Sequence, residues 1–255
     1  MIATPEIASR LQDCIRKLER SSQPVDEDIV SSGWPPLDRL LPKGGLRRGS
    51  LVEWLGAGVG SDVSALALGG VRQAARDGGA IVVVDRESEI YPPAIAAWGL
   101  ELSRVIFVHP QNRKDEFWTW DQSLRCPGVA AVWGRLERID SHDFRRLQLS
   151  AENSGCLGVL IRPGKTRGLP NWADVRLWVQ PQPASRGRRL RVELLRCRGA
   201  GGGGSVQLVL DSWNGQLRKV EKRHETLSRA LAARLACSET GSRSTGTPAA
   251  RRSAL

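Results

Sequence analysis

The sequence predicts an α/β protein with a mostly parallel central sheet, helices on both faces and an antiparallel extension at the C-terminal edge. Short apolar segments without polar alternation recur between residues 50 and 162, and each is followed by a helical pattern. This order is typical of parallel strands that are buried on both faces. Beyond residue 174, three strand-like segments follow one another without helices, which indicates antiparallel pairing: VRLWVQ, RRLRVELLRCR and SVQLVLD.

The individual elements follow from the same patterns. Predicted strands lie at about 50–55, 80–85, 104–109, 129–133 and 156–162, and predicted helices at about 62–76, 92–98, 114–125 and 141–153. Ahead of them, apolar residues at helical spacing predict an amphipathic helix over 4–20. The 255 residues are therefore divided into an N-terminal helix and linker (1–30), a core (31–220), a basic helix (221–237) and a polar tail expected to be disordered (238–255).

The chain is strongly basic, with a formal net charge of +11 and a pI of about 10.3. The charge is concentrated, because residues 186 to 223 contain ten basic and three acidic side chains, a net of +7. Such a balance favours association with nucleic acid or another polyanion. An ordinary solvated basic surface is the alternative reading.

Several function classes are not supported. The five cysteines are scattered, with no C-x-x-C pair and no histidine at ligand spacing, so we expect no metal site. No apolar run approaches the ~20 residues of a membrane span. The segment MIATPEIASRLQDC lacks the basic flank and apolar core of a signal peptide. We therefore expect a cytoplasmic protein without membrane contact.

The stretch LGAGVGSDVS, residues 55–64, lies between an apolar strand and a helix of small residues, where a phosphate-binding loop would lie. Such a loop requires G-x-x-x-x-G-K-[ST]. Here Asp62 stands in place of the lysine and Val63 in place of the hydroxyl ligand. We expect the glycines to serve the tight strand-to-helix turn, and Asp62 to suit the helix N-terminus. The residues of this degenerate loop are Gly56, Gly58, Gly60, Ser61, Asp62 and Val63.

The segment SGWPPLDRLLPKGGLRRGSLVEWLGAGVG, residues 32–60, resembles the start of a RecA-type ATPase core. VVVDRESE and LSRVIFVHP resemble its next strands, so the resemblance covers roughly residues 30 to 212. DVRLWV with RVELLRCRG is similar to the ImuA branch of RecA-like proteins, often labelled SulA-like. This resemblance implies an accessory role in SOS-induced translesion synthesis. The implied partners are a Y-family polymerase-like adaptor and an error-prone polymerase, with RecA and single-stranded DNA as further candidates.

The resemblance also bears on catalysis. The strand that should end in a metal-holding aspartate reads VAAVWGRLE, with no acid at its end. Glu87 matches the family's water-activating carboxylate, but the lysine has no substitute. Ser61 or Ser64 could replace the magnesium ligand only if the loop shifted by one residue. We expect no ATP hydrolysis and no cofactor, and leave nucleotide binding without hydrolysis open.

Two basic segments are candidate nucleic-acid contacts. RPGKTRGLPNWAD lies where RecA proteins carry a longer DNA-contacting loop, and strand alternation in RGRRLRVELLRCR places arginines on one face, away from Leu190 and Val192. The candidates are Arg162, Lys165, Arg167, Arg186, Arg188, Arg189 and Arg191. In FWTWDQ, the aromatic residues Phe117, Trp118 and Trp120 lie near Arg113 and Lys114 and could stack on nucleobases, as in single-strand binders. Trp118 and Trp120 fall on different helix faces, so at least one is expected in the core or against a partner.

Two other functions remain open at this point. A SulA-like inhibitor of cell division would share the degenerate core, although its members are usually shorter and less basic. An active RecA-type ATPase is disfavoured by the missing lysine, hydroxyl and aspartate. The two terminal helices, 4–20 and 221–237, are the expected places of partner contact because both are amphipathic and lie outside the sheet.

Overall fold

A computed structural model of the chain describes residues 29–184, 187–210 and 217–219. The predicted terminal helices, 4–20 and 221–237, and the tail 238–255 lie outside these residues, as does Arg186.

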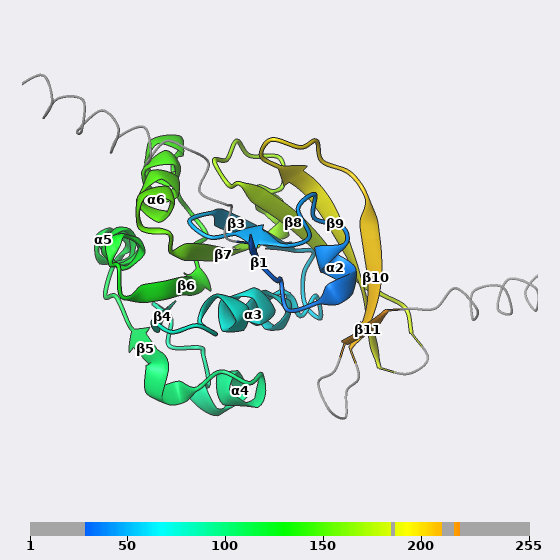
Figure 1. Ribbon diagram of the computed structural model, residues 1–255, viewed down its shortest axis with the longest axis horizontal. Coiled ribbons are helices and arrows are strands. Elements are labelled where there is room, and N and C mark those ends of the chain that lie inside the picture. The colour runs from blue at the N-terminus through cyan, green and yellow to red at the C-terminus, as the bar shows by residue number, and fades with distance from the viewer. Residues whose placement is uncertain (1–28, 185–186, 211–216, 220–255) are drawn as a thin grey trace, which may run out of the picture. The chain divides into compact units, whose positions relative to one another are not determined.

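A nine-stranded sheet forms the centre of the described structure, in the order β11-β10-β9-β8-β3-β7-β6-β4-β5 (Figure 1). The strands from β8 to β5 are parallel to their neighbours, and β8, β9, β10 and β11 pair antiparallel. Both parts of the fold prediction are thereby confirmed. The strands are β3 Leu51–Gly56, β4 Ala80–Val84, β5 Val105–Val108, β6 Val129–Arg135, β7 Leu157–Pro163, β8 Val175–Gln182, β9 Arg188–Cys197, β10 Ser205–Leu210 and β11 Leu217–Lys219.

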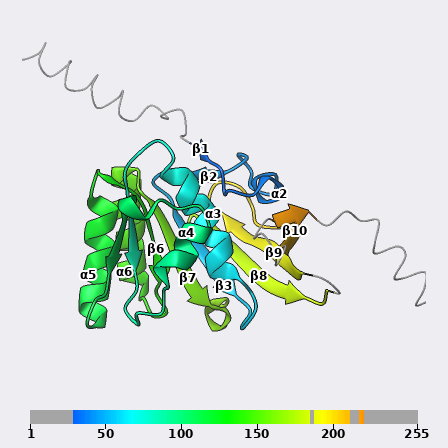
Figure 2. The ribbon, with the colours of Figure 1, turned by 90° about the horizontal axis from the view of Figure 1, so that it is seen from below.

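Helices cover both faces of the parallel part (Figure 2). On one face, α3 packs with α2 and the small antiparallel pair of β1 and β2 over a large apolar core. On the other face, α5 and α6 enclose a second core. The elements are β1 Ile29–Val30, α2 Pro35–Asp38, β2 Leu46–Arg47, α3 Val63–Ala74, α4 Pro92–Ala97, α5 Arg113–Arg125 and α6 Ser141–Ser154, with 3₁₀ turns at Leu102–Arg104 and Gly164–Thr166.

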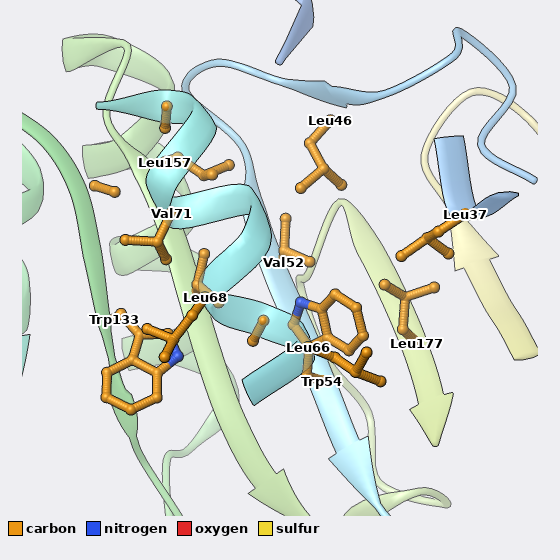
Figure 3. Close-up of a cluster of buried hydrophobic side chains, with 14 of the residues drawn as sticks. Leu37, Leu46, Val52, Trp54, Leu66, Leu68, Val71, Trp133, Leu157 and Leu177 are labelled. Carbon is orange, nitrogen blue, oxygen red and sulfur yellow. The ribbon is translucent and has the colours of Figure 1, made fainter. Parts of the chain in front are cut away.

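Helix α3 lies against the sheet through small and apolar side chains. Leu66, Leu68 and Val71 enter the core together with Trp54 of β3 and Trp133 of β6 (Figure 3). Their burial removes apolar surface from water, which is the main favourable contribution to such a core.

One glycine in α3 and one in the segment before α2 allow that segment and the helix to approach closely. A Cβ on Gly69 would lie 2.6 Å from Trp34 Nε1 and 2.7 Å from the Ser32 carbonyl oxygen. This close approach lets Trp34 Nε1 donate a hydrogen bond to the Leu66 carbonyl oxygen at 2.8 Å. Gly33, with φ of +86°, would itself meet the Gly69 backbone if it carried a Cβ. The stretch Ser32–Trp34 can therefore pack directly on α3 because Gly33 and Gly69 carry no side chains.

Each of the two long helices on the other face begins at a capping side chain. Asn112 accepts a hydrogen bond from the backbone N–H of Asp115 at 3.0 Å, and Asp140 accepts one from Asp143 at 2.7 Å. Both caps satisfy an N–H group that has no partner within its helix. The predicted starts of these helices are therefore correct to within one residue.

Gly69→Ala should lower the free energy of unfolding by about 1–3 kcal/mol, because the added methyl group overpacks against the indole of Trp34. Thermal and denaturant unfolding would measure this. Gly70→Ala is the matched control in the same helix, since its Cβ would approach the end of the Leu46 side chain at 3.1 Å and the Ser32 backbone no closer than 3.9 Å. Equal stability of the two variants would show that the close approach at Gly69 is not required.

Candidate functional site

The degenerate loop joins the end of β3 to the start of α3, at the carboxyl edge of the parallel strands. Ligands of open α/β sheets usually bind at this edge. An open cleft of about 450 Å³ lies beside the loop, between it and the ends of β6, β7 and β8. Besides the loop, it is lined by Arg135, Glu137, Ile161, Arg162, Pro163, Gly164, Lys165 and Trp178.

The loop glycines are needed for its geometry. Gly58 and Gly60 have φ of +140° and +79°, values that other residues rarely adopt. A Cβ on Gly56 would lie 2.7 Å from the Ser61 hydroxyl, so the loop folds back tightly on the strand end. Ser61 itself is only 4% exposed.

Asp62 is engaged in an ion pair. It precedes α3 with φ of +47° and its side chain makes no capping hydrogen bond. The carboxylate instead binds the guanidinium of Arg188 at the start of β9, 126 residues away in sequence. Asp62 thus lies at the N-cap position of α3, as its place before the helix predicted, and in addition pairs with a distant arginine. Arg188 brings a positive charge to the loop, but Asp62 neutralises it.

Several other acids at this edge are also matched with bases, whereas Asp85 accepts hydrogen bonds from the backbone N–H groups of Glu89 and Ile90. Glu87 lies 2.5 Å from Arg86, which also approaches Glu116 at 3.3 Å. Burial raises the pKa of the Glu116 carboxyl above its ordinary value of 4.5, and the nearby guanidinium groups of Arg86 and Arg113 offset only part of that effect. Two further pairs join Glu89 to Arg135 and Glu137 to Lys165.

Glu87 and the loop do not line the same pocket. Glu87 belongs to a separate charged pocket of about 330 Å³ at the ends of β4 and β6. Arg135 and Glu137 line both this pocket and the loop cleft, and lie between the two. Arg135 ends β6, the strand expected to carry the metal-holding aspartate. The preceding Gly134 is required, because a Cβ there would lie 2.3 Å from the Val84 carbonyl oxygen.

Arg162 is buried, which corrects its prediction as a nucleic-acid contact. Its side chain is 2% exposed and its Nη1 lies 2.6 Å from Glu53 Oε1, in the interior of the sheet. Arg176 of β8 pairs with the other oxygen of Glu53. The missed signal was Glu53 itself, since a charged residue within the apolar strand LVEWL requires a buried partner.

Arginines on β9 form a basic face on the antiparallel extension. Arg189 and Arg191 point away from the buried Leu190 and Val192, as strand alternation predicted. Arg191 lies opposite Gln180 of β8 and Gln207 of β10. Within the described part of the chain, no ion pair engages either arginine.

The remaining candidates have partners. Arg167 lies 3.5 Å from Glu193 and stacks over the Trp178 ring at 4.9 Å. Lys165 lies 3.6 Å from Glu137 and is mostly exposed. Both remain at the surface, with part of their charge compensated.

The two tryptophans of FWTWDQ separate as the helical spacing predicted. Trp120 is fully buried in the second core, whereas Trp118 is 62% exposed. Trp120 is thus a core residue, and only Trp118 can meet a partner.

The described residues contain one group of possible metal ligands. Asp140, His142 and Asp143 come close enough to share an ion, but they lie at the exposed start of α6, and Asp140 serves as its cap. No described helix combines the length and apolarity needed to cross a membrane.

Comparison with known proteins places this geometry among RecA-like chains. The chain is 31% identical to Protein ImuA of Caulobacter vibrioides over 209 residues, covering 73% of this chain and 86% of that protein. It is 27% identical to Protein RecA of Brucella canis over 169 residues, 58% of this chain and 46% of that one. The RadB recombinase structure superposes with a TM-score of 0.60 at 19% identity, over 76% of this chain and all of that chain, which shows the fold. No protein-family model matches the chain.

Arg162→Ala should lower the free energy of unfolding by about 3 kcal/mol, because it leaves the buried Glu53 with one of its two partners. Lys165→Ala, three residues away and exposed, should change it by less than about 0.5 kcal/mol. Chemical denaturation of the two variants tests the structural role assigned to Arg162. Similar small losses in both would contradict that role.

Proposed function

This chain belongs to the ImuA family of RecA-like proteins, and from that membership we propose that it is a non-catalytic accessory protein of SOS-induced translesion synthesis. The observation that carries the proposal is the ion pair between Asp62 and Arg188 at the former phosphate loop. It neutralises the position at which nucleotide-hydrolysing relatives place a lysine.

Electrostatics supports the absence of ATP turnover. A triphosphate at the loop would meet the carboxylate of Asp62 and would have to compete with it for Arg188. Displacing that carboxylate would leave two like charges side by side near a partly buried loop, where their repulsion is weakly screened. Neither Val63 nor the end of β6 offers an oxygen ligand for magnesium.

A RecA-like fold without this chemistry is suited to binding. The proposed partners are a Y-family polymerase-like adaptor and an error-prone polymerase, with RecA as a further candidate, in the cytoplasm. Arg189 and Arg191 on the outer face of β9 are the proposed contacts to single-stranded DNA. Contacts of this kind to phosphates are independent of sequence and weaken steeply with added salt.

The purified protein should hydrolyse ATP with magnesium no faster than buffer alone. Glu87→Gln should behave as the parent does, because Glu87 does not face the loop cleft. Phosphate release from highly purified protein, with and without single-stranded DNA, is the measurement. Magnesium-dependent turnover that disappears in Glu87→Gln would refute the non-catalytic assignment.

Affinity capture of the tagged full-length protein, from cells with and without DNA damage, tests the proposed role. We expect the polymerase-like adaptor and the error-prone polymerase among proteins identified by mass spectrometry. Arg189→Ala and Arg191→Ala should leave this capture unchanged, because these two side chains are proposed to contact DNA and not the protein partners. Recovery of the tubulin-like division protein instead would assign the chain to inhibition of cell division.

A further inference from the structure

The outward sides of α5 and α6 form a second basic surface, which we call the α5–α6 outer face. Its eight positions recur at helical spacing, and every side chain is exposed. Three of them are lysine or arginine and none is acidic. The positions are Lys114, Trp118, Gln122 and Arg125 on α5, and His142, Arg146, Leu149 and Asn153 on α6.

Two arginines of this face are held in place by one buried carboxylate. Asp121, fully buried between the helices, accepts hydrogen bonds from Arg146 Nη2 at 2.6 Å, Ser150 Oγ at 2.8 Å and Arg125 Nε at 3.0 Å. Burial alone would raise the pKa of the Asp121 carboxyl, but these hydrogen bonds outweigh it and hold the pKa below its ordinary value of 3.8. The two arginine side chains remain about half exposed, so they are accessible to a ligand in solvent.

Trp118 lies on the same stripe as Lys114 and Arg125, one turn from the first and two turns from the second. Its ring is 62% exposed, while Trp120 supplies the core contact of this helix. The exposed acid nearest to it in sequence, Asp115, belongs to the helix cap, where its carboxylate accepts a hydrogen bond from Asn112 Nδ2 at 2.7 Å. Trp118 therefore presents an open aromatic ring among cations.

We propose that the α5–α6 outer face binds single-stranded nucleic acid, with Trp118 stacked on a base and Lys114, Arg125 and Arg146 on the phosphates. An aromatic platform flanked by cations is the arrangement that binds single strands without sequence preference. Only two of the eight side chains are apolar, Trp118 and Leu149, which is little for the apolar centre of a protein interface. This surface is separate from the arginines of β9 and rests on the proposed function, which brings the chain to damaged DNA.

Fluorescence anisotropy with a labelled oligothymidylate of about 20 nucleotides tests the assignment on the full-length protein. Trp118→Ala should weaken binding about ten-fold and leave the salt dependence unchanged, because it removes stacking alone. Trp118→Phe should restore most of the affinity. Lys114→Ala should reduce the slope of log affinity against log salt by about 0.7, the value for one lost phosphate contact on a single strand.

Arg76→Ala is the matched control, since Arg76 is exposed just beyond the end of α3, on the opposite face of the sheet. It should change neither affinity nor slope. Trp118 and Lys114 make no core contact, so circular dichroism of these variants should match the parent.

Unchanged affinity and slope in both Trp118→Ala and Lys114→Ala would overturn the assignment. Loss of binding in Arg189→Ala and Arg191→Ala alone would also overturn it and place DNA on β9, leaving the proposed function intact. If polyglutamate displaced the oligonucleotide from the parent but bound Trp118→Ala weakly, the face would take an acidic polypeptide instead. The partner capture described above is independent of these outcomes, so failure of either proposal can be told from failure of the other.

Discussion

The charge cluster of Glu53, Arg162 and Arg176 joins the three central strands β3, β7 and β8, and the surrounding loops depend on it. Arg162 also donates to the carbonyl oxygens of Leu136 and Glu137, beyond the end of β6. Arg176 donates to those of Thr166 and Arg167, between β7 and β8. One buried carboxylate thus positions, through two arginines, the chain segments around the cleft. The buried carboxylate of Glu53 is tolerated there because two guanidinium groups pair with it.

At the carboxyl edge of the sheet, the same principle operates at the surface. Glu87, Glu89 and Glu137 each face a basic side chain, and Asp62 faces Arg188. Carboxylates engaged in this way are poorly suited to hold a cation or to orient a water molecule. In the described part of the chain, exposed basic side chains also lie away from this edge, on β9 and on the outward sides of α5 and α6, where Asp121 pairs with two of them.

The sequence was sufficient for the fold because each strand and helix carries its own periodicity and turn residues. It was also sufficient to predict the alternation of buried and exposed side chains in β9, and that Trp118 and Trp120 lie on different faces of α5. Both depend on local geometry alone. It was insufficient for Arg162 and Asp62. Their partners, Glu53 and Arg188, are 109 and 126 residues distant. Only the tertiary fold brings such pairs together, although an acid inside an apolar strand is a signal that could have been used.

The pairing of Asp62 with Arg188 also limits how this protein can change over evolutionary time. A lysine introduced at position 62 alone would lie beside Arg188 and would bring two cations together. A substitution of Arg188 alone would leave the Asp62 carboxylate without its partner, although the Asp62 side chain is only 14% exposed. Either substitution alone leaves an unfavourable arrangement of charges, which only the second substitution removes. Two interacting residues can therefore make a lysine at position 62 difficult to introduce by a single substitution.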